Sequence, residues 1–443
     1  MKLALRASST YLPKPMKRLG FLLLAVSSLS FGAEMTRVAS SFEDGDPFGM
    51  FLMLTFDRVQ EQAAITREHY QSNDLLDVTE LRYKKIQTNL GIDAHIGIYK
   101  DLELHVGVPI VFQQDRHWQY AAGTDATNST MNHNYTCSPD GTTTCGAPGS
   151  GSGDLFPGAN FDPRGAGVNS YRAGLGDFTF GIAWNAFVQK KDPSKPNWTL
   201  RFDYTAPTAT LLDPSAPTST SSRGGIGEKL HKYTFSTAVS KRLGKYLEPY
   251  FGLSYTLPWR GPGFYSNCNT PDATKLSHPA NCGLDGWKRA DTGIQPQHTG
   301  GATFGLEVTA FEDVAKHARF GFDFRGWFNY VSEGRVYNEM SDLFGKLLYT
   351  SDYGQMGAQI GLTGSAAEFI NFRAYTSLAY NTEHFLTNED IGKDLNGNNL
   401  VDVDSAPYEI NPNYDYRVDR SGRRFRVEQQ YIFRIQVTVS FNF

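Results

Sequence analysis

The chain has 443 residues, and its 46 acidic and 42 basic side chains give a formal net charge of −4. A charge this small supplies no strong positive field, so nucleic acid is excluded as a partner. The aromatic share of 13% is led by Tyr and Phe, which is typical of the aromatic belts of membrane proteins. A mean hydropathy of −0.40 is compatible with a barrel whose lumen and loops are polar.

The N-terminus has the pattern of a secretory signal peptide. Met16-Lys17-Arg18 precedes an apolar run from Leu19 to Val26, and small residues continue to Gly32, with cleavage expected before Ala33. Beyond it, no stretch approaches the roughly 18–20 apolar residues of a spanning helix, so a membrane-embedded chain must cross as strands. We divide the chain into a signal peptide, a periplasmic segment and a barrel: 1–32, 33–47 and 48–443.

Segments with apolar residues at every second position recur along the rest of the chain. In 320–330, phenylalanines alternate with Asp323 and Arg325. Charged side chains in mid-strand are costly against lipid, so we assign the polar face to the lumen. Between turn signals this period of two predicts twelve strands: 48–66, 79–99, 102–120, 171–187, 197–210, 228–242, 246–259, 298–311, 317–331, 347–363, 369–383 and 425–443.

Two of these strands have an irregular pattern. Met50–Phe56 is apolar on both faces, so its phase is undefined. Strand 347–363 changes phase near Gly354-Gln355, which we interpret as a β-bulge.

The connections between the predicted strands alternate in length. Short ones such as Lys100-Asp101 and Gly244-Lys245 alternate with long ones such as 67–78, 121–170 and 260–297. Outer-membrane barrels have short periplasmic turns and long extracellular loops. The sequence therefore predicts an all-β fold, a transmembrane antiparallel up-and-down β-barrel of roughly twelve strands in a bacterial outer membrane, surrounded by its lipid and lipopolysaccharide.

The last strand alternates most regularly, and its apolar face includes Phe433 and Phe441 and ends at Phe443. A final alternating strand that stops at a terminal Phe resembles the signal that outer-membrane assembly machinery recognises, so these three residues are expected to form that signal. The alternative is an ordinary half-buried strand of a soluble sandwich.

Four cysteines form two locally spaced pairs, Cys137/Cys145 and Cys268/Cys282. In an exported chain each pair is expected to close one loop as a disulfide. Both pairs fall in predicted extracellular loops. Free thiols are the alternative, and neither spacing matches a zinc site.

The predicted loop 384–424 carries oxygen-bearing side chains at alternate positions around a Gly-Asn turn. This spacing is similar to the first nine positions of a dockerin or EF-hand calcium loop, although Asn399 replaces the turn glycine and Ser405 stands where a Glu is expected. Calcium is the one candidate cofactor, and a solvated acidic loop is the alternative. The candidate ligands are Asp394, Asn396, Asn398, Asp402 and Asp404.

The predicted lumen carries charges of both signs at similar depth. They could form a transverse field that orients a polar solute, or pair with one another and fill a narrow barrel. No His-x-Ser pattern of an embedded phospholipase occurs, so enzymatic activity is not expected. The lumen candidates are Asp93, His95, Glu103, His105, Arg201, Asp203, Glu248, Glu307, Asp323, Arg325, Arg373 and Arg434.

The segment Gly174-Leu-Gly-Asp-Phe-Thr-Phe-Gly-Ile-Ala-Trp-Asn-Ala-Phe187 resembles the Gly-x-Gly-Asp strand of the barrel family named for the MetA pathway of phenol degradation, which is distantly similar to fatty-acid-porin-like channels. Phe202–Thr208 is similar to that family's Pro-Thr-Gly strand end, with Ala209 in place of the glycine, and Tyr246–Thr256 looks like its next hairpin strand. The resemblance covers the middle third of the chain and implies passage of small, hydrophobic or aromatic solutes.

Two functions are compatible with these patterns. The first is a channel or transporter for small solutes. The second is a non-conducting surface scaffold, in which disulfide-closed extracellular loops bind cell-envelope proteins or external partners.

Overall fold

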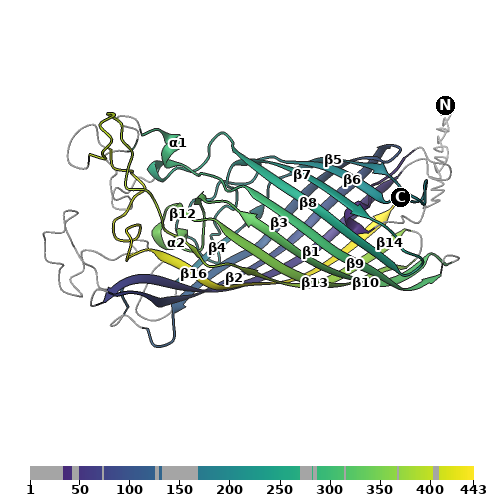
Figure 1. The fold of residues 1–443 in the computed structure, drawn as a ribbon, viewed down its shortest axis with the longest axis horizontal. Coiled ribbons are helices and arrows are strands. Elements are labelled where there is room, and N and C mark those ends of the chain that lie inside the picture. The colour runs from purple at the N-terminus through teal and green to yellow at the C-terminus, as the bar shows by residue number, and fades with distance from the viewer. Residues whose placement is uncertain are drawn as a thin grey trace, which may run out of the picture.

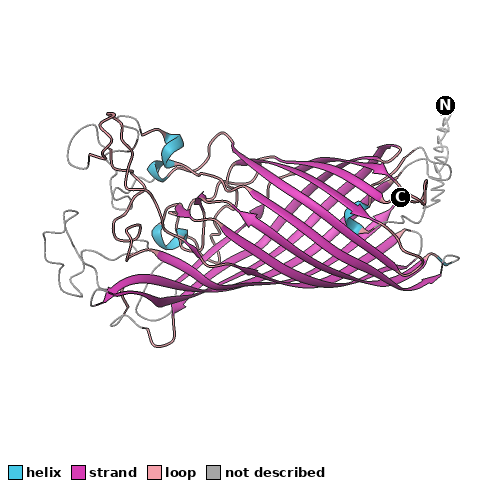
Figure 2. Cartoon of the chain, in the orientation of Figure 1, coloured by secondary structure: helices cyan, strands magenta, loops and turns pink. Residues whose placement is uncertain are grey.

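The computed structural model shows an all-β chain whose strands run obliquely around the longest axis of the molecule (Figures 1 and 2). Among the residues described, no helix is both long and apolar enough to cross a lipid bilayer. The structure describes residues 33–41, 49–71, 74–124, 129–131, 168–269, 282, 287–313, 316–366, 369–402 and 409–443.

Twelve wall positions form one closed antiparallel sheet within these ranges, in chain order, and the pairing of the first strand with the last closes it. A closed sheet leaves no unpaired edge, which lets a barrel lie in lipid. The wall strands are β1 (Met50–Gln71), β2 (Asp74–Tyr99), β3 (Leu102–Tyr120), β4 (Val168–Leu175) with β5 (Thr179–Phe187), β6 (Asn197–Thr205), β7 (Leu230–Ser240), β8 (Leu247–Arg260), β9 (Thr299–Asp313), β10 (Ala318–Val331), β13 (Tyr353–Ala366), β14 (Ile370–Asn381) and β16 (Phe425–Asn442).

The predicted twelve-strand barrel is confirmed, and β3 has the predicted bounds.

Short elements accompany the wall at its two ends. The short elements are η1 (Glu34–Thr36), η2 (Asn267–Asn269), α1 (Arg289–Thr292), β11 (Gly334–Val336), α2 (Ser341–Phe344), β12 (Leu348–Thr350) and β15 (His384–Phe385).

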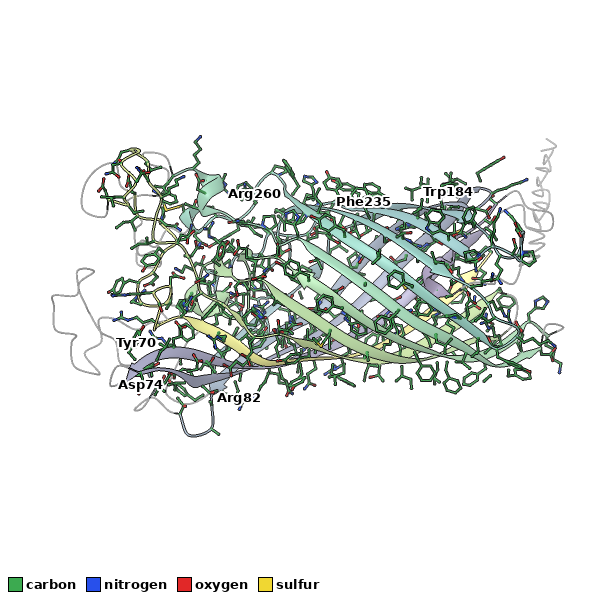
Figure 3. All side chains as sticks on the ribbon, viewed as in Figure 1. Tyr70, Asp74, Arg82, Trp184, Phe235 and Arg260 are labelled. Atoms are coloured by element: carbon green, nitrogen blue, oxygen red, sulfur yellow. A yellow bond between two sulfur atoms is a disulfide. The ribbon has the colours of Figure 1, made fainter. Side chains whose placement is uncertain are left out.

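The outer face of the wall is an apolar belt. The predicted assignment of alternate residues to the outer and inner faces is confirmed. Exposed aromatic and aliphatic side chains alternate with inward polar ones such as Glu103 and Asp323, which are 0% and 2% exposed. Figure 3 shows Trp184 and Phe235 on the outside of the barrel. Apolar side chains outside and polar ones inside suit lipid outside and water inside. The belt includes Phe56, Val106, Phe180, Phe251, Phe304, Phe324, Ile360, Leu378 and Phe433.

The first hairpin corrects one sequence prediction. Residues 67–78 do not form a long loop, because Arg67 pairs with Val78 and Gln71 with Asp74. With 22 and 26 residues, β1 and β2 are longer than a bilayer requires, so their tip extends past the neighbouring strands (Figure 1).

Two other predicted strands are interrupted. The phase change near Gly354 is a break and not a bulge: β12 pairs with β11, and β13 then pairs with β10 and β14 without a register shift. Strand 171–187 is split between β4 and β5, and the free side of β4 contacts a connecting segment, where Gly224 N donates to Tyr171 O at 2.9 Å.

At the extracellular end, residues 334–350, 384–402 and 409–424, here called the cap, pack against the inner wall of the barrel. Every residue of α2 is buried, and cap side chains form one apolar core with the inner wall. This core includes Ile65, Leu81, Tyr83, Trp118, Met340, Leu343, Phe344, Leu386, Val418 and Phe425.

Candidate functional site

Residues 33–41, here called the plug, lie inside the opposite, periplasmic end of the barrel. These residues belong to the predicted periplasmic segment 33–47, of which 42–47 lie outside the described residues, and the division of the chain at these positions stays a prediction. Ala33 N donates to Glu248 Oε1 at 2.6 Å, and Ala39 N donates to Glu103 Oε2 at 2.6 Å. A segment that is mostly irregular must find acceptors for its backbone N–H groups, and the inward carboxylates supply them.

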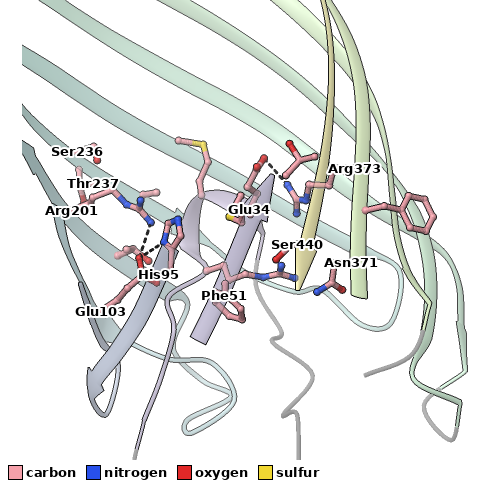
Figure 4. Close-up of a pocket in the computed structure, with 17 residues that line it drawn as sticks. Glu34, Phe51, His95, Glu103, Arg201, Ser236, Thr237, Asn371, Arg373 and Ser440 are labelled. Carbon is pink, nitrogen blue, oxygen red and sulfur yellow. Dashed lines mark hydrogen bonds and ion pairs between the residues drawn. The ribbon is translucent and has the colours of Figure 1, made fainter. Parts of the chain in front are cut away.

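The plug is further held by one acidic side chain. Glu34 Oε2 lies 2.8 Å from Arg325 Nη2. It also lies 2.5 Å from Arg373 Nη1 (Figure 4). Its backbone N donates to Glu307 Oε1 at 3.0 Å. Ser40 packs directly on Gly97 of β2, where an added Cβ would lie 2.7 Å from the Ser40 carbonyl carbon. The plug thus fits against the inner wall at both its ends.

A second set of contacts beside the plug joins side chains from β8, β9, β10 and β14 across the lumen face of the wall. Tyr250 Oη donates to Asp323 Oδ1 at 2.6 Å and accepts from Arg325 Nε at 2.9 Å. Arg373 also reaches Glu307, at 3.3 Å. An unpaired charge buried in a narrow lumen would be costly. In this network each charged side chain faces at least one group of opposite charge, which offsets that cost.

The other charged candidates gather on β2, β3 and β6. Glu103 Oε1 lies 2.7 Å from His95 Nδ1 and 3.6 Å from both His105 Nδ1 and Arg201 Nη2. His105 Nε2 in turn lies 2.5 Å from Asp203 Oδ1. Figure 4 shows His95, Glu103 and Arg201 on the side of the cavity opposite Arg373.

Two candidates stand slightly apart from this group. Asp93 lies two residues from His95 on β2, opposite Gly107 of β3. Arg434 is half-exposed, 3.4 Å from Asp57 Oδ1. The structure therefore brings most of the charged candidates into paired contact with one another and with the plug.

A cavity of about 370 Å³ lies between the plug and the wall. Apolar side chains from both contribute to it, namely Met35, Phe51 and Met53, and charged groups from both clusters face it. The inward side chains Phe51 and Met53 also settle the phase of the first strand, since Leu54 and Phe56 are exposed outside.

The sequence did not identify Glu34, Met35, Arg37 or Tyr250 as site residues. The plug has no alternating pattern, so no strand model could place it in the lumen. Tyr250 had a usable signal, because it lies on the polar face of 247–257 beside Glu248.

The predicted disulfide Cys268–Cys282 is present, with a Cα–Cα distance of 5.5 Å, whereas Cys137 and Cys145 lie outside the described residues. At the C-terminus, Phe443 N donates to Met50 O at 3.0 Å and so helps to close the barrel. Phe433 and Phe443 are exposed on β16 and beyond its end, with Phe441 between them. Their role in assembly stays a prediction.

The predicted calcium loop is held largely by its own hydrogen bonds. Asp394 accepts from the backbone N–H groups of Asn396, Gly397 and Asn399, and these donors, Asn399 first, lower its pKa. Both Asn396 and Asn398 donate side-chain amides to Asp402 Oδ2, at 2.7 and 3.0 Å.

Asp404 lies outside the described residues. Calcium binding stays a prediction, and a melting temperature unchanged by chelator would remove it.

The structure combines a closed sheet, an apolar outer belt, a polar lumen and short turns at the end that holds the plug and the C-terminus (Figure 1). It is a transmembrane barrel of the bacterial outer-membrane type.

No protein-family model and no curated protein matches this chain. Among solved structures, an outer membrane channel from Pseudomonas putida F1 has a TM-score of 0.41 at 9% identity, covering 92% of this chain and 100% of that chain. A Pseudomonas aeruginosa FadL homologue has a TM-score of 0.33 at 9% identity, over 89% of this chain and 90% of that one. The TodX monoaromatic hydrocarbon channel, as a deltaS2 mutant, has 0.31 at 10% identity, over 90% and 91%.

Proposed function

We propose that the protein is an outer-membrane channel for small, hydrophobic or aromatic solutes, and that the plug gates it. The observation that carries this proposal is the cavity of about 370 Å³ between plug and wall. Its size falls in the range of roughly 300–1,000 Å³ that is usual for small-molecule sites.

The cavity lining suits a solute that is mainly apolar. Met35, Phe51 and Met53 offer apolar surface, while Arg201 and Arg373 are engaged by carboxylates. Paired charges leave little net field to bind an ion, but they keep hydrogen-bonding groups at the edge of the cavity. A ring-sized solute with one polar group fits this lining best.

The plug is suited to movement because polar contacts dominate its attachment. Its fully buried side chains are small, such as Ala33 and Ala39, so little apolar area is lost when it leaves. Hydrogen bonds to the wall can be exchanged for hydrogen bonds to water at a net cost of about 0.5–1.5 kcal/mol each. Displacement therefore requires far less free energy than unfolding any wall strand.

Planar-bilayer recording of the full chain tests the proposal. Deletion of residues 33–41 is expected to convert rare, small current steps into a persistent larger conductance, because it removes the obstruction at the periplasmic end. Lys316→Ala, a substitution of an 81%-exposed side chain on a periplasmic turn, is the matched control and should behave as wild type.

The deletion variant must retain heat-dependent gel mobility, which shows that its barrel is folded. A folded deletion variant that carries no current would contradict the channel and favour the surface scaffold. For the solute class, liposomes that contain the protein should take up a monoaromatic probe faster than empty liposomes.

We also propose the surroundings of the barrel from the same features. Outer-membrane lipid and lipopolysaccharide contact the apolar belt, assembly machinery binds the last strand, and the chain is exported through a cleaved signal peptide. Trypsin shaving of intact cells, with the cap cleaved and the short turns protected, would test this orientation.

A further inference from the structure

The cluster of His95, Glu103 and His105 has features that solute passage does not explain. His95 of β2 and His105 of β3 are direct partners in the antiparallel ladder. Glu103 lies two residues before His105 on β3, so it points to the same, inward face. Two imidazoles and a carboxylate thus meet at one point of the inner wall without any loop to position them.

The three ligand atoms are close enough to share one metal ion. One ring nitrogen of each histidine and one carboxylate oxygen of Glu103 all lie within 4.8 Å of one another. Metal–nitrogen and metal–oxygen bonds of about 2.0–2.2 Å place tetrahedral ligands roughly 3.3 Å apart. The separations of 2.7 and 3.6 Å from Glu103 Oε1 to the two Nδ1 atoms lie on either side of this value.

The second nitrogen of His105 is already oriented. His105 Nε2 lies 2.5 Å from Asp203 Oδ1 on β6, two strands away in the wall. The intervening residue is Gly181 of β5, where a Cβ would overlap both the His105 ring and the Asp203 carboxylate. A carboxylate on the far nitrogen is the usual support of a metal-binding histidine, because it fixes the proton there and leaves the other nitrogen free to bind.

That other nitrogen is His105 Nδ1, and it has no hydrogen-bond partner among the described residues although it is buried. The whole side chain is 6% exposed. A buried polar atom without a partner is costly, and here it faces Glu103 Oε1 from 3.6 Å, a distance that leaves room for an ion between them.

We propose that His95, Glu103 and His105 bind a late first-row divalent transition-metal ion of the Zn²⁺ type, with Asp203 as the positioning residue. Two imidazoles and one carboxylate favour such an ion over Ca²⁺ or Mg²⁺, which take oxygen ligands. His95 and Glu103 also line the cavity, so a fourth position of the ion faces open space. The proposal holds whether or not the barrel conducts.

Zinc uptake by the untagged full chain in detergent micelles tests the site. Equilibrium dialysis against micromolar Zn²⁺ is expected to give one bound ion per chain. His105→Gln and Glu103→Gln each keep a polar side chain of similar length and should weaken binding by at least about 100-fold. His117→Gln is the matched control, because His117 lies on the same strand and hydrogen-bonds to Asn169, and it should bind as wild type.

Cobalt replaces zinc as a spectroscopic probe of the geometry. Wild-type protein with Co²⁺ should show the strong visible absorption of a four-coordinate ion, and Asp203→Asn should lower its affinity by about 10–100-fold while retaining the band. Wild-type protein that takes up no Zn²⁺, or folded H105Q and E103Q variants that bind as tightly as wild type, would overturn the proposal.

Discussion

The segments at the two ends of the lumen are attached to the wall by different kinds of contact. At the periplasmic end, the plug is attached by hydrogen bonds and ion pairs, such as Glu34 with Arg325 and Thr36 Oγ1 with Ser240 Oγ at 2.8 Å. At the extracellular end, Leu343, Phe344 and Phe425 belong to a contiguous apolar core that joins the cap to the wall.

This difference indicates which of the two segments, the plug or the cap, is easier to displace from the wall. Apolar burial stabilises by about 25 cal/mol for each Å² removed from water, and apolar groups gain no compensating contacts when they return to water. Polar contacts are largely replaced by contacts with water when they break. The cap is therefore expected to stay in place, and the plug is expected to be the easier of the two segments to displace.

The largest expected effect comes from breaking the cap at Arg335. Its guanidinium donates to both carboxylate oxygens of Glu389 and to the carbonyls of Asp291 and Gly293, the latter two at 2.8 and 2.9 Å. Arg335→Ala leaves the buried Glu389 carboxylate with the Asn411 amide but without a counter-charge, which should destabilise the cap by about 3–5 kcal/mol. Urea-dependent proteolysis of the cap measures the loss.

Arg420→Ala is the control for this variant, because Arg420 is exposed on the same cap. It should change the free energy by less than about 0.5 kcal/mol. Equal resistance of R335A and wild type would show that the cap is held by its apolar core alone.

The second effect is a pH dependence confined to the cap. Burial raises the pKa of Asp419 to about 7, against the opposing charge of Lys346 and with a further rise from Glu389. Its folded form favours the protonated carboxyl, so this stabilisation is complete below about pH 4 and is lost as the pH rises through 7. The change amounts to at most about 4 kcal/mol.

Asp415 does not contribute within that window. Burial alone would raise its pKa, but hydrogen bonds and charge from Arg417 outweigh burial and lower the pKa to about 2. Cap proteolysis should therefore accelerate between about pH 4 and 7.5 in wild type and change little in D419N. A D419N variant with the full wild-type pH dependence would assign the effect to another group.

The third effect concerns the plug. Glu34→Gln keeps the shape of the side chain but removes the charge that faces Arg325 and Arg373. Loss of these charge-assisted bonds should weaken the attachment of the plug by about 1–2 kcal/mol. This corresponds to roughly a tenfold rise in the fraction of time that the channel is open. Single-channel recording measures this fraction, with Asp192→Asn on a periplasmic turn as the control. An unchanged open fraction would mean that the plug does not gate the current.

The membrane part of the fold could be predicted because lipid imposes a rule on every second residue. Phe324 had to face outward and Asp323 inward, and both do. The rule ends where lipid ends, and for this reason the paired residues 67–78 had the appearance of a loop. The same limit applies to the plug, which touches no lipid and so has no periodic pattern.

The candidate site was predictable as a set of inward charges but not as contacts. Period two places His105 and Asp203 on the inner face, yet nothing in the sequence shows that they meet across Gly181. That contact depends on the register of three neighbouring strands and on the missing Cβ of the middle one. Tertiary pairing, rather than composition, determines the cluster.

The smallest expected effect separates polar contacts inside the lumen from those outside it. Lys191 Nζ lies 2.6 Å from Asp101 Oδ2 on the periplasmic turns, with the lysine side chain 45% exposed. Since water screens such a pair and both side chains lose entropy in forming it, Lys191→Ala should cost less than about 1 kcal/mol and leave the open fraction unchanged. Thermal midpoints in detergent at low and high salt provide the measurement. A loss above about 2 kcal/mol would show that contacts between the periplasmic turns also stabilise the closed state. The plug would then not be the sole element that keeps the periplasmic end closed.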